Sequence, residues 1–291
     1  MQIKSSELII NADGSIFHLH VKPEQLADKV ILVGDPGRVS LVASHFDKVE
    51  CEVENREFRT VTGYYQGKRL TVVSTGIGCD NIDIVVNELD ALVNIDFETR
   101  TVHKDLKKLS LVRIGTCGGL QSYTPEGTFV LSQKSIGFDG LLNFYAGRNE
   151  VCDLAFEKEF ITHMGWQGSQ CIAHPYVIAA DEDLSDRIAG ADMVRGVTIA
   201  CGGFYGPQGR QLRLPIADSH QNEKIMSFVS SHDERITNFE MESSALAGLA
   251  RLLGHKATTC CMVIANRMAG KANPNYKNSI DNLIKLVLDR I

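Results

Sequence analysis

Short runs of β-branched and apolar residues alternate with segments of helical periodicity along most of this chain. The apolar runs have the length of buried strands and lie at residues 29–34, 69–75, 109–115, 127–132, 176–180, 194–200 and 257–266. Between and after them, apolar side chains gather on one helical face at residues 81–93, 243–253 and 280–288. This alternation predicts an α/β fold.

The organisation of the chain indicates one unit. Its 291 residues contain neither a fixed repeat nor a linker rich in Pro, Gly or Ser. With 44% hydrophobic residues, the chain can form one large core. We therefore predict a single domain over residues 1–291. Residues 140–174 have weak strand signals and contain the only Trp, so we expect an insertion there.

Charge and cysteine usage narrow the functional classes. A formal net charge of −6 argues against a broad nucleic-acid surface, which needs clustered cations. The eight cysteines lack the paired spacing of a zinc site, and the pair His18 and His20 has no third ligand at useful spacing. No run approaches the roughly 18 apolar residues of a membrane span, and the N-terminus has no signal-like pattern. We expect a cytoplasmic protein that binds neither nucleic acid nor membrane.

Three of the predicted strands run into glycine-rich stretches, "GDPGR" (34–38), "STGIG" (74–78) and "RIGTCGG" (113–119). We expect all three stretches to be tight turns at one edge of the sheet, where backbone N–H groups can face an anion. Arg38 and Arg113 would converge on that anion and Thr116 would add a hydroxyl, which favours phosphate. The alternative is that each turn only connects a strand to a helix, with each arginine paired to a surface carboxylate.

Two further stretches carry polar groups suited to a nucleoside. Phe204 offers a ring for stacking, Gln208 offers both a donor and an acceptor, and Arg210 offers donors only. This set suits a planar heterocycle such as uracil. The alternative is an ordinary surface turn. Around Met241, the carboxylates of Glu240 and Glu242 could accept from sugar hydroxyls. The alternative there is a helix cap.

Together these residues closely resemble the nucleoside phosphorylase-I family, and within it the uridine phosphorylases. The motifs occur in the family's order and also include "FHLH" (17–20), "NREF" (55–58), "FYGPQGR" (204–210), "EMES" (240–243) and "NR" (266–267). The resemblance implies one domain with a central twisted mixed β-sheet flanked by helices. It also implies a pentosyltransferase that converts uridine and phosphate, its co-substrate, to uracil and ribose 1-phosphate, with no cofactor required.

The resemblance assigns a role to each motif residue. By similarity, phosphate is bound by Gly34, Arg38, Arg113 and Thr116, and by Arg56 from a neighbouring subunit. Ribose is bound by Glu240, Met241 and Glu242, with His18 of the neighbour at the 5′-hydroxyl. The base is bound by Gly118, Phe204, Gln208 and Arg210, and the catalytic residues are Arg113, Arg210 and Arg267.

Sharing of active sites implies a homo-oligomer, either a dimer or a hexamer. Glu57 matches a carboxylate that helps some bacterial members bind a potassium ion between subunits, which makes it a candidate metal ligand.

Two departures from the family pattern bear on the substrate. Asn266 stands where hexameric purine-specific members usually carry an aspartate that protonates the base, which weakens a purine assignment. "FYGPQGR" also differs slightly from the usual order "FYxGQxR", which bears on the geometry of the loop. The alternatives are a purine nucleoside phosphorylase, a nucleosidase that uses water, and a nucleoside-binding protein without activity.

Overall fold

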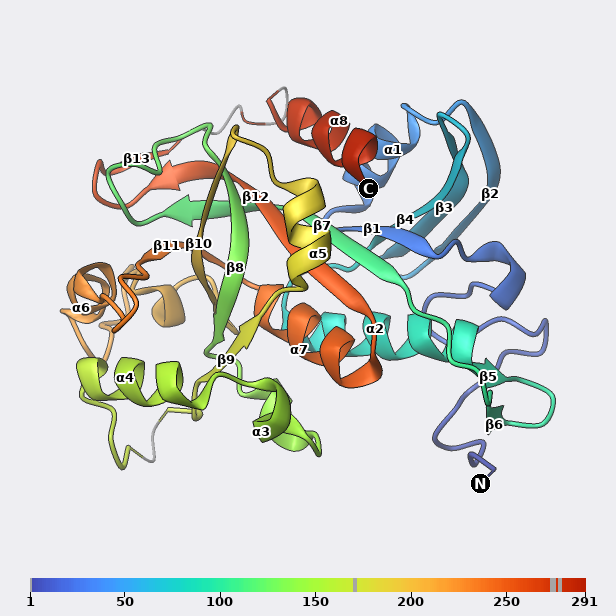
Figure 1. The fold of residues 1–291 in the computed structure, drawn as a ribbon, viewed down its shortest axis with the longest axis horizontal. Coiled ribbons are helices and arrows are strands. Elements are labelled where there is room, and N and C mark those ends of the chain that lie inside the picture. The colour runs from blue at the N-terminus through green and yellow to red at the C-terminus, as the bar shows by residue number, and fades with distance from the viewer. Residues whose placement is uncertain (1, 170–171, 273–275, 277–278) are drawn as a thin grey trace.

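A computed structural model describes residues 2–169, 172–272, 276 and 279–291. In this part of the chain, one mixed sheet of eleven strands forms the centre of the molecule and helices pack around it (Figure 1). The predicted α/β fold with a mixed sheet flanked by helices is confirmed. The strands are β1 (Lys29–Val33), β2 (Lys48–Asn55), β3 (Phe58–Tyr65), β4 (Lys68–Ser74), β7 (Ser110–Gly119), β8 (Phe129–Gly137), β9 (Tyr176–Ala179), β10 (Met193–Ala200), β11 (Ile236–Glu240), β12 (Lys256–Asn266) and β13 (Lys271–Ala272).

Most of the helices lie between these strands in the chain, while the first precedes β1 and the last follows β13. The helices are η1 (Pro23–Gln25), α1 (Pro36–Ala43), α2 (Cys79–Asn94), η2 (Leu141–Phe144), α3 (Arg148–Val151), α4 (Leu154–Met164), α5 (Glu182–Ile188), η3 (Gly206–Gln208), α6 (Gln221–Ser227), α7 (Ser243–Leu253) and α8 (Ile280–Arg290). A separate pair of short strands, β5 (Ile95–Asp96) and β6 (Thr101–Val102), follows α2.

Five of the strands pair in a closed ring. β7 pairs with β12, β12 with β8, β8 with β10, β10 with β11, and β11 returns to pair with β7. From β7 the sheet continues in the order β1, β4, β3 and β2. Because β7 pairs with β1, β12 and β11, its backbone is fixed in register on both sides.

The stretch "RIGTCGG" forms strand, so the prediction of a turn there is wrong. β7 runs on to Gly119 because both β12 and β11 continue to pair with it. Glycine is needed here because other atoms lie very close to the strand backbone, and not because the chain reverses its direction. A Cβ at position 115 would lie 2.2 Å from Nη1 of Arg113, and one at position 119 would lie 2.3 Å from the carbonyl oxygen of Thr124.

The alternation of side chains along β1 explains how helices cover both faces. Val30 and Leu32 belong to a core cluster with residues of α2 and α7. Ile31 and Val33 belong to a second cluster with residues of α1, α5 and α8. The helices predicted at 81–93, 243–253 and 280–288 are thus confirmed, and each buries the apolar face that its periodicity indicates.

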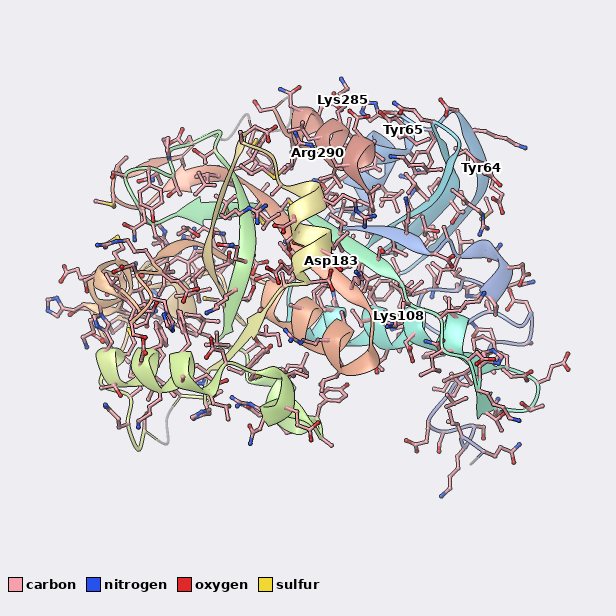
Figure 2. All side chains as sticks on the ribbon, viewed as in Figure 1. Tyr64, Tyr65, Lys108, Asp183, Lys285 and Arg290 are labelled. Carbon is pink, nitrogen blue, oxygen red and sulfur yellow. The ribbon has the colours of Figure 1, made fainter. Side chains whose placement is uncertain are left out.

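The outer face of α8 is charged. In Figure 2, Lys285 and Arg290 lie at the outside of this helix. Lys285 pairs with Asp281 at 2.8 Å, and Arg290 pairs with Asp192 at 3.0 Å. The buried face of α8 is thus held by apolar contacts, and the charged pairs lie on its solvent side.

Residues 140–174 contain η2, α3 and α4. Residues 170 and 171 lie outside the described part of the chain. Trp166 packs edge-on against Phe138 and Phe160, in a third core cluster that α4 and α6 share. That this segment is an insertion stays a prediction. Among the described helices, none combines the length and the apolar character required to span a membrane.

Candidate active site

A cavity of about 1110 Å³ lies where β1 and β4 end and where α1, α2 and α7 begin. Of the two remaining glycine-rich stretches, "STGIG" forms a turn at this edge, as predicted, whereas "GDPGR" is mostly helix, because α1 begins at Pro36 and only Gly34 and Asp35 connect it to β1. In "STGIG", Gly76 and Gly78 have φ values of +72° and +102°, a backbone conformation that favours glycine. Three helix N-termini therefore lie at one cavity, and the positive ends of their dipoles suit an anion.

The cavity gathers most of the predicted site residues from distant parts of the chain. All of them line it except His18 and Arg56. Those present are Gly34, Arg38, Glu57, Arg113, Thr116, Gly118, Phe204, Gln208, Arg210, Glu240, Met241, Glu242 and Arg267.

Arg38 and Arg113 lie close together, as the sequence predicts. Arg38 projects from α1 and donates through Nη1 to the carbonyl oxygen of Ile114 at 3.2 Å. Burial and the charge of Arg113 lower the pKa of Arg38. An anion between the two guanidinium groups would relieve this repulsion, so the pair is suited to bind phosphate.

Arg113 is buried and lies against two carboxylates. Its Nη1 donates to Oε2 of Glu240 at 3.2 Å, and its Nη2 donates to Oε2 of Glu242. Burial opposes the charge of Arg113, but Glu242 and Glu240 outweigh that effect and raise its pKa. Its Nε has no hydrogen-bond partner among the described residues. The guanidinium is therefore permanently charged and held in one orientation.

The two glutamates differ in their contacts. Glu240 ends β11 and caps α7, because it accepts from the backbone N–H groups of Glu242 and Ser243 and from the Ser243 hydroxyl at 2.6 Å. Burial raises the pKa of Glu240, and Arg113 opposes this. Glu242 instead accepts from the N–H of Gly78 at 2.8 Å, which joins the start of α2 to the start of α7. The cap expected as the alternative is thus present at Glu240.

The predicted base-binding residues form one contact group. The Arg210 guanidinium lies over the Phe204 ring, 3.7 Å from its centroid, and Nη1 donates to the Phe204 carbonyl oxygen at 2.7 Å and to Oε1 of Gln208. Arg267 donates to the Gln208 carbonyl oxygen at 3.0 Å. Burial and the charge of Arg267 lower the pKa of Arg210 to about 10. Two cations thus lie beside one amide, an arrangement that favours a partner with negative oxygens.

Asn266 has a structural role. Its side-chain amide is buried and donates to the carbonyl oxygens of Gln121 at 3.0 Å and Thr124 at 2.8 Å. Its Oδ1 accepts from the N–H of Ala269 at 2.9 Å. These contacts hold the end of β12, from which Arg267 projects into the cavity.

His18 and Arg56 belong to two segments that contact each other, and neither side chain lines the cavity of its own chain. Asn55 donates to the His18 carbonyl oxygen at 2.8 Å, and the Arg56 guanidinium lies 5.8 Å from the centroid of Phe17. His18 contacts Glu88, which lies ten residues beyond the cavity end of α2 at Gly78, roughly 15 Å along the helix axis. The imidazole of His18 is therefore held far from Glu240 and Glu242 of its own chain.

Sequence reasoning gave no role to several residues of the cavity, among them Ile77 and Asn81. Ile77 is 70% exposed, which is unusual for such an apolar side chain. The Asn81 amide lies over Gly76, where a Cβ would be 2.2 Å from its Nδ2. Ile77 lies within "STGIG" and Asn81 follows it by three residues, so their closeness to a glycine turn is the signal that could have found them.

Glu57 lines the cavity from the turn between β2 and β3. Among the described residues, no group of three His, Cys, Asp or Glu side chains could hold a metal ion. Within the described part of this chain, Glu57 is therefore not part of such a metal-binding group.

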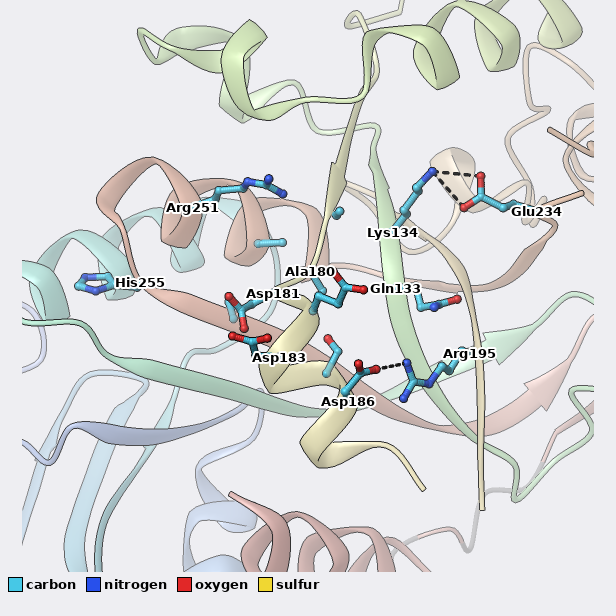
Figure 3. Close-up of a pocket in the computed structure, with 15 residues that line it drawn as sticks. Gln133, Lys134, Ala180, Asp181, Asp183, Asp186, Arg195, Glu234, Arg251 and His255 are labelled. Carbon is cyan, nitrogen blue, oxygen red and sulfur yellow. Dashed lines mark hydrogen bonds and ion pairs between the residues drawn. The ribbon is translucent and has the colours of Figure 1, made fainter. Parts of the chain in front are cut away.

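A second cavity, of about 590 Å³, lies beside α5 (Figure 3). Several of its charged side chains are paired, some with one another and some with residues outside the cavity. Lys134 contacts Glu234 at 3.0 Å and Arg195 contacts Asp186 at 2.5 Å. Asp181 caps α5 by accepting from the Leu184 N–H at 2.8 Å. The cavity at the helix N-termini is therefore the better candidate for an active site.

A sequence model of the phosphorylase superfamily matches residues 28–289. The chain belongs to the phosphorylase superfamily. A uridine phosphorylase of Thermococcus kodakarensis is 28% identical over 271 residues, which cover 92% of this chain and 83% of that protein. A guanosine phosphorylase of Halorubrum lacusprofundi is 27% identical over 274 residues, which cover 94% of this chain and 92% of that one.

Solved structures show the same relationship. The crystal structure of Trypanosoma brucei nucleoside phosphorylase, described as showing uridine phosphorylase activity, superposes with a TM-score of 0.88 at 28% identity, covering 97% of this chain and 98% of that one. The family resemblance predicted from the motifs is confirmed. Superfamily relatives named for uridine and for guanosine are about equally similar, so the base-binding residues must decide the substrate.

Proposed function

We propose that this protein is a uridine phosphorylase, a pentosyltransferase that converts uridine and phosphate to uracil and ribose 1-phosphate. The observation that carries the proposal is the shared cavity, which is lined by Arg38 and Arg113, by Met241 and Glu242, and by Gln208 and Arg210. Cations for phosphate, a carboxylate for sugar hydroxyls and an amide with donors for a base thus border a single space.

Phosphate is both the nucleophile and a counter-ion in this mechanism. Arg38, Arg113 and Thr116 hold it beside the anomeric carbon, and the backbone of Gly34 contributes at the start of α1. Arg113 is itself fixed by Glu240 and Glu242, so it orients phosphate without first having to become ordered. Positioning of this kind supplies a large part of the rate in a displacement with two reactants.

Ribose lies between phosphate and base. Glu242 accepts from the sugar hydroxyls, Met241 packs on the apolar face of the ring, and Glu240 positions both Glu242 and Arg113. His18 of a neighbouring subunit contacts the 5′-hydroxyl, and Arg56 of that subunit reaches the phosphate. We infer a homo-oligomer with shared active sites from the position of both residues outside their own cavity.

The base leaves as an anion. A phosphate oxygen forms a bond to C1′ while the bond between C1′ and N1 breaks. The electron pair of the broken bond passes to uracil, which then takes up a proton. Gln208 and Arg210 bind the edge of the base, Arg267 supports them, Phe204 packs beside the ring, and Gly118 leaves room for it. Donors aimed at such a developing charge are typically worth about 3–4 kcal/mol each.

Uridine is preferred over purine nucleosides because of the base-binding group. Gln208 and Arg210 match the polar edge of uracil, and Asn266 takes the place of the aspartate expected in purine-specific relatives. Its amide is fully engaged by backbone groups. The reaction needs no metal or organic cofactor in this proposal, and a potassium ion at Glu57 would act only as a support between subunits.

One assay tests the proposal against its alternatives. Uridine, thymidine and inosine are incubated with and without phosphate, and base release is followed by absorbance. We expect uridine turnover that requires phosphate. Equal turnover without phosphate would indicate a nucleosidase, faster turnover of inosine a purine enzyme, and binding without turnover a nucleoside-binding protein.

A further inference from the structure

Glu88 is an unusual residue for the middle of α2, because its carboxylate turns to a loop that precedes the first strand. It accepts from the backbone N–H of His18 through both oxygens, at 3.0 and 3.1 Å, and from the N–H of Leu19 at 2.8 Å. Its Oε1 also lies 2.7 Å from Nδ1 of the His18 ring. One side chain thus holds both the backbone and the ring of His18.

This contact sets which nitrogen of His18 is free. With Nδ1 facing a carboxylate, Nδ1 carries the proton and Nε2 is left to meet another group. The part of the chain that the structure describes offers no partner to Nε2. The ring is 28% exposed, and Glu88 is 12% exposed behind it. His18 is therefore oriented on one side and open on the other.

The same small region includes Arg56. Asn55 donates to the His18 carbonyl oxygen, and Arg56 follows it with a φ of +56°, a conformation rarely adopted by residues other than glycine. Phe58, two residues later, contacts the His18 ring edge-on at 6.4 Å between centroids. Residues 17–20 and 55–58 thus form one surface element, and Glu88 fixes its position on α2.

We propose that Glu88 is a positioning residue that prepares His18 to recognise the 5′-hydroxyl of a nucleoside bound to a neighbouring subunit. The inference rests on the proposed function, because His18 acts there in trans. A pre-oriented imidazole binds a hydroxyl without the entropic cost of ordering the ring. Glu88 contributes to selectivity for that hydroxyl although it touches no substrate.

The test compares two substrates that differ only at the 5′ position. Uridine and 5′-deoxyuridine are assayed with saturating phosphate, and the ratio of their kcat/KM values measures recognition of the 5′-hydroxyl. We expect Glu88→Ala to lower this ratio about tenfold, the typical effect of one lost hydrogen bond to a well-oriented group. Glu88→Gln keeps an acceptor for the backbone N–H groups, so we expect a loss of about threefold.

Three controls make the result specific. Glu98→Gln makes the same change of charge in an exposed turn after α2 and should leave the ratio unchanged. His18→Ala should lower the ratio as far as Glu88→Ala does, and the double variant should lower it no further. Sedimentation and thermal unfolding of each variant show whether the oligomer is intact, and if Glu88→Ala does not fold, Glu88→Gln decides.

The outcomes separate this inference from the proposed function. If His18→Ala lowers the ratio but both Glu88 variants keep the wild-type ratio, Glu88 has no positioning role and the inference is overturned. If His18→Ala also keeps the wild-type ratio, the trans role of His18 in the proposed function fails, and the role of Glu88 fails with it. A loss at both positions that is not additive supports the inference.

Discussion

Replacement of Arg210 by alanine should greatly reduce turnover and leave the fold intact. In the ground state, Arg210 lies beside Arg267, and burial together with this second charge lowers its pKa to about 10. Negative charge that develops on uracil as the glycosidic bond breaks offsets this repulsion. The guanidinium therefore interacts more strongly with the transition state than with bound uridine, which is the condition for catalysis.

The size of the effect follows from this role. Loss of one donor aimed at a developing anion typically costs about 2.7–4 kcal/mol, so we expect kcat for uridine to fall about 10²–10³-fold. Arg210 is half-buried, and its contacts with Phe204 and Gln208 lie outside the main core. The midpoint of thermal unfolding should therefore move by less than about 3 °C.

The assay measures uracil release at saturating phosphate, with Arg213→Ala as the matched control in the same loop. Arg213 is exposed, and its variant should keep wild-type turnover.

The dependence on pH gives an independent check. Arg210 is charged below its pKa and loses its proton as the pH rises through about 10, so the wild-type rate should fall there. Ionisation of the substrate affects the wild type and the Arg210→Ala variant alike, so the difference between their two pH–rate profiles reports the ionisation of Arg210. Turnover of the alanine variant within about threefold of wild type would refute the role.

Three other substitutions test single contacts. Arg38→Lys should raise the KM for phosphate about tenfold and change the KM for uridine little, because lysine lacks the planar fork that binds two oxygens; steady-state kinetics with each substrate varied in turn checks this. Gly119→Ala would place a Cβ 2.3 Å from the Thr124 carbonyl oxygen, and we expect a loss of about 1–3 kcal/mol in the free energy of unfolding by urea. Asn266→Asp places a buried charge where two carbonyl oxygens accept; we expect a loss of about 2–4 kcal/mol and no gain in inosine phosphorolysis.

The sequence predicted most of the strands whose side chains are buried on both faces, because these read as continuous apolar runs. It missed β2, β3 and β11, as well as the two-residue strands β5, β6 and β13, although β3 is largely buried and β11 is buried throughout. β2 has the sequence "KVECEVEN", in which charged and apolar residues alternate, and most of its side chains are exposed. Strands exposed on one face have a weaker apolar signal, and the alternation of period two was the only local indication.

The site shows a similar division. Residues such as Arg38, adjacent to glycine turns, could be predicted because the turn and the cation are neighbours in the chain. The contacts of Arg113 with Glu240 and Glu242 span 127 and 129 residues and depend on the ring of strands that brings β11 beside β7. Glu88 could not be predicted, since a glutamate within an amphipathic helix is ordinary until the loop that it holds is known.

The charge of the site gives a physical reason for the predicted oligomer. Arg113 needs two carboxylates to remain buried and charged, so the group formed with Glu240 and Glu242 has a formal charge of −1. Arg38 brings the sum near the phosphate to zero, which leaves the helix N-termini to attract a dianion, and helix dipoles contribute about 1 kcal/mol or less each when exposed. Arg56 of a neighbouring subunit would supply the missing positive charge. Phosphate affinity should therefore depend on assembly of the subunits, and Arg56→Ala should weaken phosphate binding in an intact oligomer without displacing uridine.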